Sequence, residues 1–488
     1  MDNLKKNTVS GFFWRFAERC GAQLVSFVVS IVLARLLSPD DYGVIALVTV
    51  FITLSQVFID SGMGNALIQK KNSDDLDFSS VFFFNIFICS ILYILLFIGA
   101  PFIAAVYSNE QLTAIIRVLG IVVIVSALKN VQQAYVSKHM MFKKFFFATL
   151  GGTLIAAIIG IIMAYQGFGV WALVAQQIVN VTIDTIVLWC TVNWKPQMQF
   201  SFERIKDLYS YGWKLLVSSI INTLYDNLRQ LIIGKLYSSA DLAYYNRGKQ
   251  FPNLAVNNIN ASIDSVLLPA LAMEQDNKQN VKNMTRRAIK TSSYFMWPIM
   301  VGMAVTAEPI VRILLTEKWI SAVPYLRIFC VVSAFQPIQT SNLNAIKAVG
   351  RSDLFLKLEV IKKSIGLCIL FVVLRKGVMA IALSLLVYTL VAQIINSFPN
   401  KKLLNYSYAE QMKDILPYIC LSLIMGLVVY PVSFLRLAPI LILLIQVVLG
   451  VIIYWGSSKI FRIDMYVYIE DTIVQYLKKK GVLKKREK

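Results

Sequence analysis

Successive blocks of apolar residues, each long enough to cross a lipid bilayer, constrain this chain more than any other feature. The 488 residues are 57% hydrophobic and have a mean hydropathy of +0.64. A block of about 20 apolar residues crosses a ~30 Å hydrocarbon core as one α-helix. The sequence predicts about fourteen blocks: 10–37, 42–62, 80–105, 113–137, 147–165, 168–192, 209–236, 244–272, 287–316, 323–348, 354–374, 378–398, 414–434 and 437–456. The expected fold class is therefore an all-α integral membrane protein.

The loops between these blocks alternate between rich and poor in lysine and arginine. If the N-terminus is cytoplasmic, the inside loops contain Lys70–Lys71, Lys143–Lys144 and Lys401–Lys402 among many other basic residues. The outside segments then hold only Lys235, Arg247, Lys318, Arg375, Lys376 and Arg436. Because basic loops stay on the cytoplasmic side, we expect both termini in the cytoplasm. The formal net charge of +21 then lies beside anionic lipid headgroups, so no nucleic-acid partner is expected.

Polar residues at helical spacing mark one face of four predicted spans. The four stripes are Arg15, Arg19, Gln23, Ser26 and Ser30; Thr49, Thr53, Gln56 and Asp60; Lys214, Ser218, Asn222, Asp226 and Arg229; and Asn246, Gln250, Asn253, Asn257, Asn260 and Asp264. A charge at bilayer depth costs at least ~2.5 kcal/mol, so these faces are expected to line a central hydrophilic cavity. Lys129, Asn130 and Gln133 of the fourth span are expected to add to its wall. Such a cavity is typical of a transporter.

The stripes occupy the first two spans of each half, which indicates two six-helix lobes. We expect an N-lobe at 1–200, a C-lobe at 201–400 and two further membrane helices at 401–456. The cavity is expected to lie between the lobes, although no convincing residue-level repeat relates them. The segment 457–488 alternates aromatic and apolar residues before a run of lysines. This pattern predicts a basic amphipathic tail on the cytoplasmic membrane surface.

Residue types that carry catalysis or bind metals are sparse. The single histidine, His139, lies in a basic loop, so histidine-based acid–base catalysis has no support. The chain has no G-x-x-x-x-G-K-[ST] phosphate-binding loop, so it is not expected to hydrolyse ATP. The six cysteines fall inside spans at irregular spacing and are expected to pack as small apolar side chains. We therefore expect no enzyme activity, no catalytic residue, no cofactor and no metal site.

Three stretches near the N-terminus together resemble a known family. They are Gly11–Trp14 (GFFW), Leu33–Gly43 (LARLLSPDDYG) and Asp60–Gln69 (DSGMGNALIQ). They are similar to the N-terminal signature of Wzx-like polysaccharide flippases, which form the polysaccharide-transport family of the multidrug/oligosaccharidyl-lipid/polysaccharide exporter superfamily. Further similar stretches are Leu242–Arg247, Val266–Ala270, Trp319–Pro324 and Gly350–Asp353. The resemblance therefore extends over residues 10–355.

The resemblance implies a flippase in the bacterial cytoplasmic (inner) membrane. Its cargo would be a polyprenyl-pyrophosphate-linked oligosaccharide, moved to the outer leaflet by alternating access for O-antigen, capsule or exopolysaccharide synthesis. Membrane lipids and polysaccharide polymerase or assembly proteins are the implied partners. A cation-coupled multidrug exporter of the same architecture is an alternative. A membrane polysaccharide polymerase or ligase is a weaker one, because the sequence has no long outside loop.

The implied flippase function assigns binding and coupling roles to the stripe residues. Arg15 and Arg19 suit the pyrophosphate, because the arginine fork makes paired hydrogen bonds to phosphate oxygens. Lys214 is either a third contact or a lysine that reaches for the membrane interface, and Arg229 either binds substrate or pairs with Asp226. The expected substrate-binding residues are Arg15, Arg19, Gln23, Lys214, Asn222, Arg229, Asn253, Asn257 and Asn260. Asp60, Asp226 and Asp264 are the candidates for coupling to a proton or sodium gradient.

Overall fold

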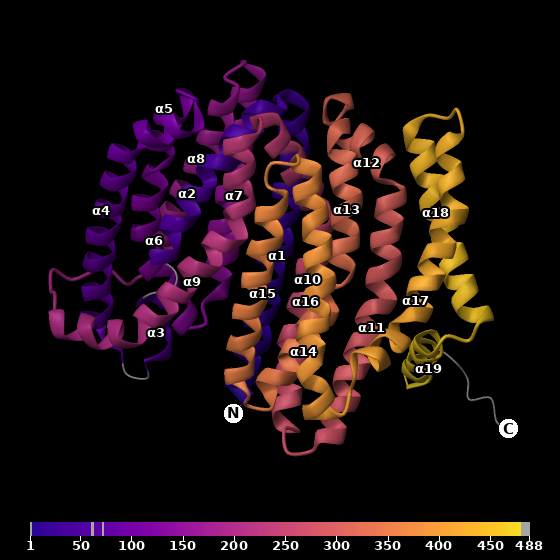
Figure 1. The fold of residues 1–488 in the computed structure, drawn as a ribbon. Helices are drawn as coiled ribbons and strands as arrows, with labels where there is room; N and C mark the ends of the chain where they lie inside the picture. The colour runs from indigo at the N-terminus through magenta and orange to yellow at the C-terminus, as the bar shows by residue number, and fades with distance from the viewer. Residues whose placement is uncertain (1, 60–62, 71–72, 480–488) are drawn as a thin grey trace. The chain divides into compact units, whose positions relative to one another are not determined.

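The structure is a computed structural model that describes residues 2–59, 63–70 and 73–479, apart from some side chains such as those of Arg15 and Lys214. Within these ranges every regular element is a helix (Figure 1). The long helices are α1 (Asp2–Leu36), α2 (Pro39–Ile59), α4 (Asp75–Tyr107), α6 (Ile121–Lys138), α7 (Phe142–Tyr165), α8 (Val170–Thr191), α9 (Phe202–Leu236), α10 (Ser239–Met273), α11 (Lys278–Val305), α15 (Ser352–Val373), α16 (Val378–Leu404), α17 (Tyr408–Val429), α18 (Pro439–Ile460) and α19 (Asp464–Lys479). The shorter ones are α3 (Asn65–Gln69), α5 (Gln111–Leu119), α12 (Ala307–Leu314), η2 (Glu317–Ala322), α13 (Val323–Ala334), α14 (Gln336–Ala348) and η3 (Tyr430–Phe434). The all-α fold predicted from the sequence is confirmed.

Each of the fourteen predicted spans coincides with one helix or with two consecutive helices. Ten of the described segments are long and apolar enough to cross a membrane, or eleven if α11 and α12, bent by 67°, form one span. Helices α9, α10 and α15 lie outside this set, and each carries several charged residues. Many apolar side chains face outward, as Phe102 does with 73% of its surface exposed, which suits contact with lipid. The multi-pass membrane fold is thus established, and the count of fourteen stays a prediction.

The chain forms two compact units, Met1–Ala243 (unit 1) and Tyr244–Lys488 (unit 2). In unit 1, α7 packs against both α1 and α8, and α6 packs against α4 and α8. In unit 2, α11 packs against α13, α14 and α17, while α16 packs against α13, α14 and α15. These units are defined by compactness alone, so the lobe boundaries near residues 200 and 400 stay predictions.

An aromatic cluster closes one end of unit 1. The rings of Phe78, Tyr135 and Trp194 have centroids 5.5 to 6.0 Å apart, and each such pair typically adds about 0.5–1.5 kcal/mol beyond its buried area. The Gln132 amide donates a hydrogen bond to the Trp194 carbonyl at 3.1 Å. The segment that leaves α8 is therefore fixed against α4 and α6.

A network of buried amides joins three helices of unit 2. Asn342 on α14 donates to Gln411 Oε1 on α17 at 2.9 Å. The Asn342 Oδ1 atom accepts hydrogen bonds from Asn400 Nδ2 on α16 at 2.7 Å and from Gln411 Nε2 at 3.1 Å. All three side chains have no exposed surface. Because a buried amide is costly to leave unpaired, this network fixes how α14, α16 and α17 pack together.

The same helix start occurs twice, 200 residues apart. Helices α1 and α9 are each 35 residues long, and a serine is the second residue after the end of each, directly before α2 and α10. The backbone N–H of Asp41 donates to the Ser38 hydroxyl at 3.2 Å, and that hydroxyl donates to the Asp41 carboxylate at 2.6 Å. Ser238 and Asp241 repeat both bonds at 3.1 and 2.7 Å. The two halves thus share a reciprocal cap that was not evident as a sequence repeat.

Candidate functional site

The polar stripes of α1 and α2 are only partly described. Arg19 is exposed and Gln23 is half-buried, whereas the Arg15 side chain and all of Asp60 lie outside the described residues. Thr49 and Thr53 donate their hydroxyl hydrogens to carbonyls of their own helix at 2.7 and 2.8 Å. Their polarity is thus satisfied locally. Arg19 is the charged member of these two stripes that the structure leaves accessible.

The stripe of α9 combines one buried and two exposed residues of the predicted site. Arg229 has only 6% of its surface exposed, and its guanidinium carbon lies 6.0 Å from the centroid of the Tyr225 ring. Asn222 and Asp226 are exposed, and the Lys214 side chain lies outside the described residues. The choice between substrate binding and an internal ion pair for Arg229 stays open.

The stripe of α10 places Asp264 beside an amide that the sequence did not indicate. Asn344 Nδ2 on α14 donates to Asp264 Oδ1 at 2.7 Å. Asn257 is exposed, and Asn253 and Asn260 are half-buried. The Asn260 Oδ1 atom is buried and accepts no hydrogen bond from the described part of the chain. The amides of this face can therefore hydrogen-bond to polar hydroxyl groups, which is what an oligosaccharide presents.

Unit 1 also buries an ion pair that sequence analysis did not recognise. Lys129 Nζ on α6 lies 2.9 Å from Asp184 Oδ2 on α8, and the two side chains are 17% and 11% exposed. The second carboxylate oxygen, Asp184 Oδ1, is buried and has no hydrogen-bond partner among the described residues. The neighbouring Asn130 accepts a hydrogen bond from Asn85 at 3.3 Å. Asp184 is the sole charged residue in the sequence of α8, which is the signal that singles it out.

Unit 2 contains an apolar groove of about 440 Å³ between α11, α17 and α18. A glycine lets two of the walls approach, because an added Cβ at Gly426 of α17 would lie 2.8 Å from Val301 of α11. The polar Gln446 in the wall donates to the Ser433 hydroxyl at 2.8 Å, so its amide N–H group already has a hydrogen-bond partner. A groove of this size and character suits a hydrocarbon chain. Sequence analysis missed it because three separate helices form it.

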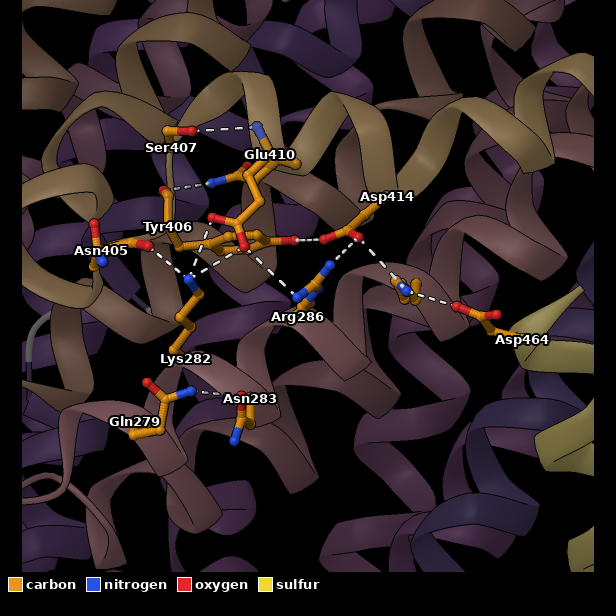
Figure 2. Close-up of polar contacts among 12 residues, drawn as sticks. Gln279, Lys282, Asn283, Arg286, Asn405, Tyr406, Ser407, Glu410, Asp414 and Asp464 are labelled. Carbon is orange, nitrogen blue, oxygen red and sulfur yellow. Dashed lines mark hydrogen bonds and ion pairs between the residues drawn. The ribbon is translucent and has the colours of Figure 1, made fainter.

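Charged residues at the N-terminal end of α11 face the acidic first turns of α17 (Figure 2). Arg286 Nη2 lies 2.6 Å from Asp414 Oδ1. One turn earlier, Lys282 Nζ lies 3.2 Å from Glu410 Oε1 and donates to the Asn405 carbonyl at 2.7 Å. Because residues four apart share a helix face, these two pairs form a ladder between α11 and α17.

Lys290 extends the ladder to the C-terminal helix α19. Its Nζ lies 3.5 Å from Asp414 and 3.0 Å from Asp464. Tyr406 donates its hydroxyl hydrogen to Asp414 Oδ2 at 2.8 Å, and burial, reinforced by that carboxylate, raises the pKa of Tyr406 above its ordinary value. We call this set of contacts among α11, α17 and α19 the α11 clamp. Its members neutralise one another, so its role is structural.

Residues 32–324 of the chain match the family described as "Polysaccharide biosynthesis protein". This match covers more than half of the sequence. The chain belongs to that family. The resemblance to Wzx-like polysaccharide flippases inferred from the sequence motifs is thereby confirmed.

Three relatives with known names align over most of their length. Lipopolysaccharide biosynthesis protein WzxC of Escherichia coli is 23% identical over 440 residues, which are 87% of this chain and 89% of that protein. Teichuronic acid biosynthesis protein TuaB of Bacillus subtilis is 22% identical over 72% of this chain and 74% of its own. Succinoglycan biosynthesis transport protein ExoT of Rhizobium meliloti is 21% identical over 69% of this chain and 68% of that protein.

Solved structures with this fold belong to membrane transporters. The lipid II flippase MurJ, in an inward closed conformation, superposes with a TM-score of 0.72 and 17% identity over 94% of this chain and 99% of that one. An inward-facing multidrug resistance MATE family transporter of the MOP superfamily superposes with a TM-score of 0.62 and 14% identity over 78% of this chain and 95% of that one. At such identities the likeness establishes the fold alone. This member of the polysaccharide biosynthesis family is thus a multi-pass membrane protein of that fold.

Two of the stretches that carry the family resemblance meet within unit 2. The Arg247 guanidinium carbon lies 5.2 Å from the ring centroid of Trp319, against which Tyr244 also packs edge-on at 6.0 Å. Gly248 permits this approach, because an added Cβ would lie 2.6 Å from the Cβ of Tyr325. These motif residues therefore fasten α10 to η2 and α13. Their role within unit 2 is packing.

Proposed function

We propose that this protein flips a polyprenyl-pyrophosphate-linked oligosaccharide from the cytoplasmic to the outer leaflet of the bacterial cytoplasmic membrane. The observation that carries the proposal is the family match over residues 32–324 in a chain that has the fold of a lipid II flippase. Relatives aligned over most of their length are named for lipopolysaccharide biosynthesis and for succinoglycan biosynthesis transport. The product of the pathway would be a surface polysaccharide.

The chemistry of the two units supports this cargo. A polyprenyl tail needs an apolar channel, and the groove of unit 2 supplies about 440 Å³ lined by α11, α17 and α18. Burial of such a tail contributes about 25 cal/mol per Å² of apolar surface. A pyrophosphate needs cations, and the accessible Arg19 on α1 is the described candidate. Amides such as Asn257 on α10 suit the sugar hydroxyl groups.

Energy for uphill movement would come from an ion gradient or from consumption of the product outside. Asp60, Asp226 and Asp264 are the proposed coupling carboxylates. The hydrogen bond from Asn344 to Asp264 gives that carboxylate an uncharged partner, so a bound cation would not compete with an arginine or lysine there. Alternating access of the cavity to the two sides completes the proposal.

Deletion of the gene tests the proposed function. Spheroplasts of the deletion strain should accumulate lipid-linked oligosaccharide that impermeant periodate does not oxidise, as measured by mass spectrometry, and surface polysaccharide should be lost. In complementation, Arg19→Ala should lower export by roughly ten- to a hundredfold, because a charge-assisted hydrogen bond of about 1.5–3 kcal/mol is lost. Arg19→Lys should restore it in part. Normal surface polysaccharide in the deletion strain would contradict the proposal.

A multidrug exporter is the second candidate, and its support is the fold likeness to the MATE transporter, with a TM-score of 0.62. In that case the deletion strain should become sensitive to cationic dyes while its surface polysaccharide is unchanged. The same strain therefore separates the two functions. A strain with lost polysaccharide and unchanged dye tolerance supports the flippase.

A further inference from the structure

The Lys129–Asp184 pair is a costly feature to keep inside a bundle of apolar helices. Both residues lie well inside their helices, α6 and α8, and their charged atoms are 2.9 Å apart. Taking two charges out of water is favourable only if their geometry is good and their remaining hydrogen-bonding capacity is satisfied. Here Asp184 Oδ1 is buried with no partner among the described residues. The pair is therefore incompletely satisfied on the aspartate side.

The surroundings of the pair supply no second partner of either charge. The elements that pack against α6 or α8 are α2, α3, α4, α5 and α7. Their described charged residues lie in the first turns of α2, α4 and α7, or on α5: Asp40, Asp41, Asp75, Asp77, Lys143, Lys144 and Arg117. Asp77 is paired with Lys70, and Arg117 donates to the Phe97 carbonyl. Glu18 on α1 faces α7, where it accepts a hydrogen bond from Thr149. Lys129 and Asp184 thus depend on each other.

The lysine is the reachable half of the pair. Its side chain keeps 17% of its surface exposed, compared with 6% for Lys362, which pairs with Glu359 inside unit 2. An ammonium group has three hydrogen-bond donors, of which the contact with Asp184 uses one, so Lys129 can bond to a second acceptor. A pyrophosphate group, which carries more than one negative charge, competes well with a single carboxylate for such a donor.

We propose that Lys129 binds the pyrophosphate of the carrier lipid by exchanging Asp184 for a phosphate oxygen, and that Asp184 takes up one proton in the same event. The proposal rests on the proposed flippase function. The balance is simple: Asp184 loses its cation, a proton from water joins the carboxylate, and the released lysine pairs with the phosphate. A buried carboxylate without a cation is neutralised because the charged form is poorly solvated there. Substrate binding and proton uptake are then linked, so a proton gradient can change the affinity for the substrate.

Calorimetry on the full chain in detergent tests the exchange with geranyl pyrophosphate as the probe. Titration at one pH in two buffers of different ionisation enthalpy gives the number of protons taken up for each probe bound. Wild type should take up about one proton, since a single carboxylate changes state. Asp184→Asn should take up none and should bind roughly tenfold tighter, because no counter-ion must be displaced. Lys129→Met should weaken binding by roughly ten- to a hundredfold.

Two further variants keep the test decisive. Glu359→Gln removes the partner of the buried Lys362 in unit 2 and should leave the affinity and the proton count unchanged. If Lys129→Met does not fold, the double variant Lys129→Leu/Asp184→Leu removes both charges and should fold, bind the probe as weakly as expected for Lys129→Met, and take up no proton. Wild-type binding without proton uptake, or binding unaffected by the loss of Lys129, overturns the exchange and leaves the flippase function standing. No wild-type binding of the probe overturns both.

Discussion

Each unit buries a polar group of interacting side chains between helices, and two of these groups differ in charge: the Lys129–Asp184 pair of unit 1 is ionic, whereas the Asn342, Asn400 and Gln411 network of unit 2 consists of uncharged amides. The Lys129–Asp184 pair has one carboxylate oxygen without a described partner, and its lysine is still 17% exposed. The Asn342, Asn400 and Gln411 network of unit 2 has no exposed surface, and Asn342 bonds to both of its neighbours. The charged pair can therefore change partners, whereas the amide network can only hold its helices. Burial alone therefore does not distinguish a side chain that takes part in transport from one that only holds helices together.

The largest expected effect concerns the charged pair. Lys129→Leu leaves the Asp184 carboxylate without its cation, and unit 1 should lose about 3–5 kcal/mol of stability. Lys129→Leu/Asp184→Leu should recover most of that loss, because two apolar side chains then fill the same space. Thermal unfolding of both variants in one detergent measures the difference. Equal stability of the single and double variants would mean that the pair contributes no mutual stabilisation, and the contrast with unit 2 would disappear.

A smaller loss is expected in the amide network. Asn342→Leu leaves the amides of Asn400 and Gln411 without their acceptor, which should cost about 2–4 kcal/mol. Asn396 provides the matched control, because it is equally buried and makes no side-chain hydrogen bond within the described residues. Asn396→Leu should cause no loss of stability. If both leucine variants unfold at the same temperature, the network does not hold unit 2 together.

The smallest effect concerns the helix cap that occurs twice within unit 1. Ser38→Ala and Ser238→Ala each remove the hydroxyl of a reciprocal cap, and each should lower stability by about 1 kcal/mol. Because the caps have the same geometry, the two losses should agree. Denaturation of the single variants under identical conditions checks this. A loss at one serine only would show that the repeated caps are energetically unequal.

Much of the fold could be predicted because its strongest signal is local. Each predicted span coincides with one helix or two consecutive helices, since about 20 apolar residues can satisfy their backbone in a membrane only as a helix. The bends were harder to foresee. The break between α11 and α12 at Thr306 turns the chain by 67° inside one predicted block, and hydropathy contains no signal for it.

The candidate site was predictable only within single helices. Helical spacing identified the faces that carry Asp226 and Asp264, but spacing reports nothing about a neighbouring helix. The partner of Asp264 proved to be Asn344, 80 residues away on α14. Contacts between distant segments are set by packing, which one sequence does not display.

The α11 clamp has a mechanical consequence for the apolar groove. It joins the N-terminal ends of α11 and α17 through Arg286 and Asp414, whereas the groove lies further along both helices, beyond Tyr294 and Met425. Lys290 brings α19 into the same joint, and Tyr466 of α19 packs against Trp455 of α18. At the opposite end of the groove η3 joins α17 to α18, and α18 packs against α12. The walls of the groove are therefore held together at both ends, so a hydrocarbon chain that enters it has to fit the spacing that these two joints set.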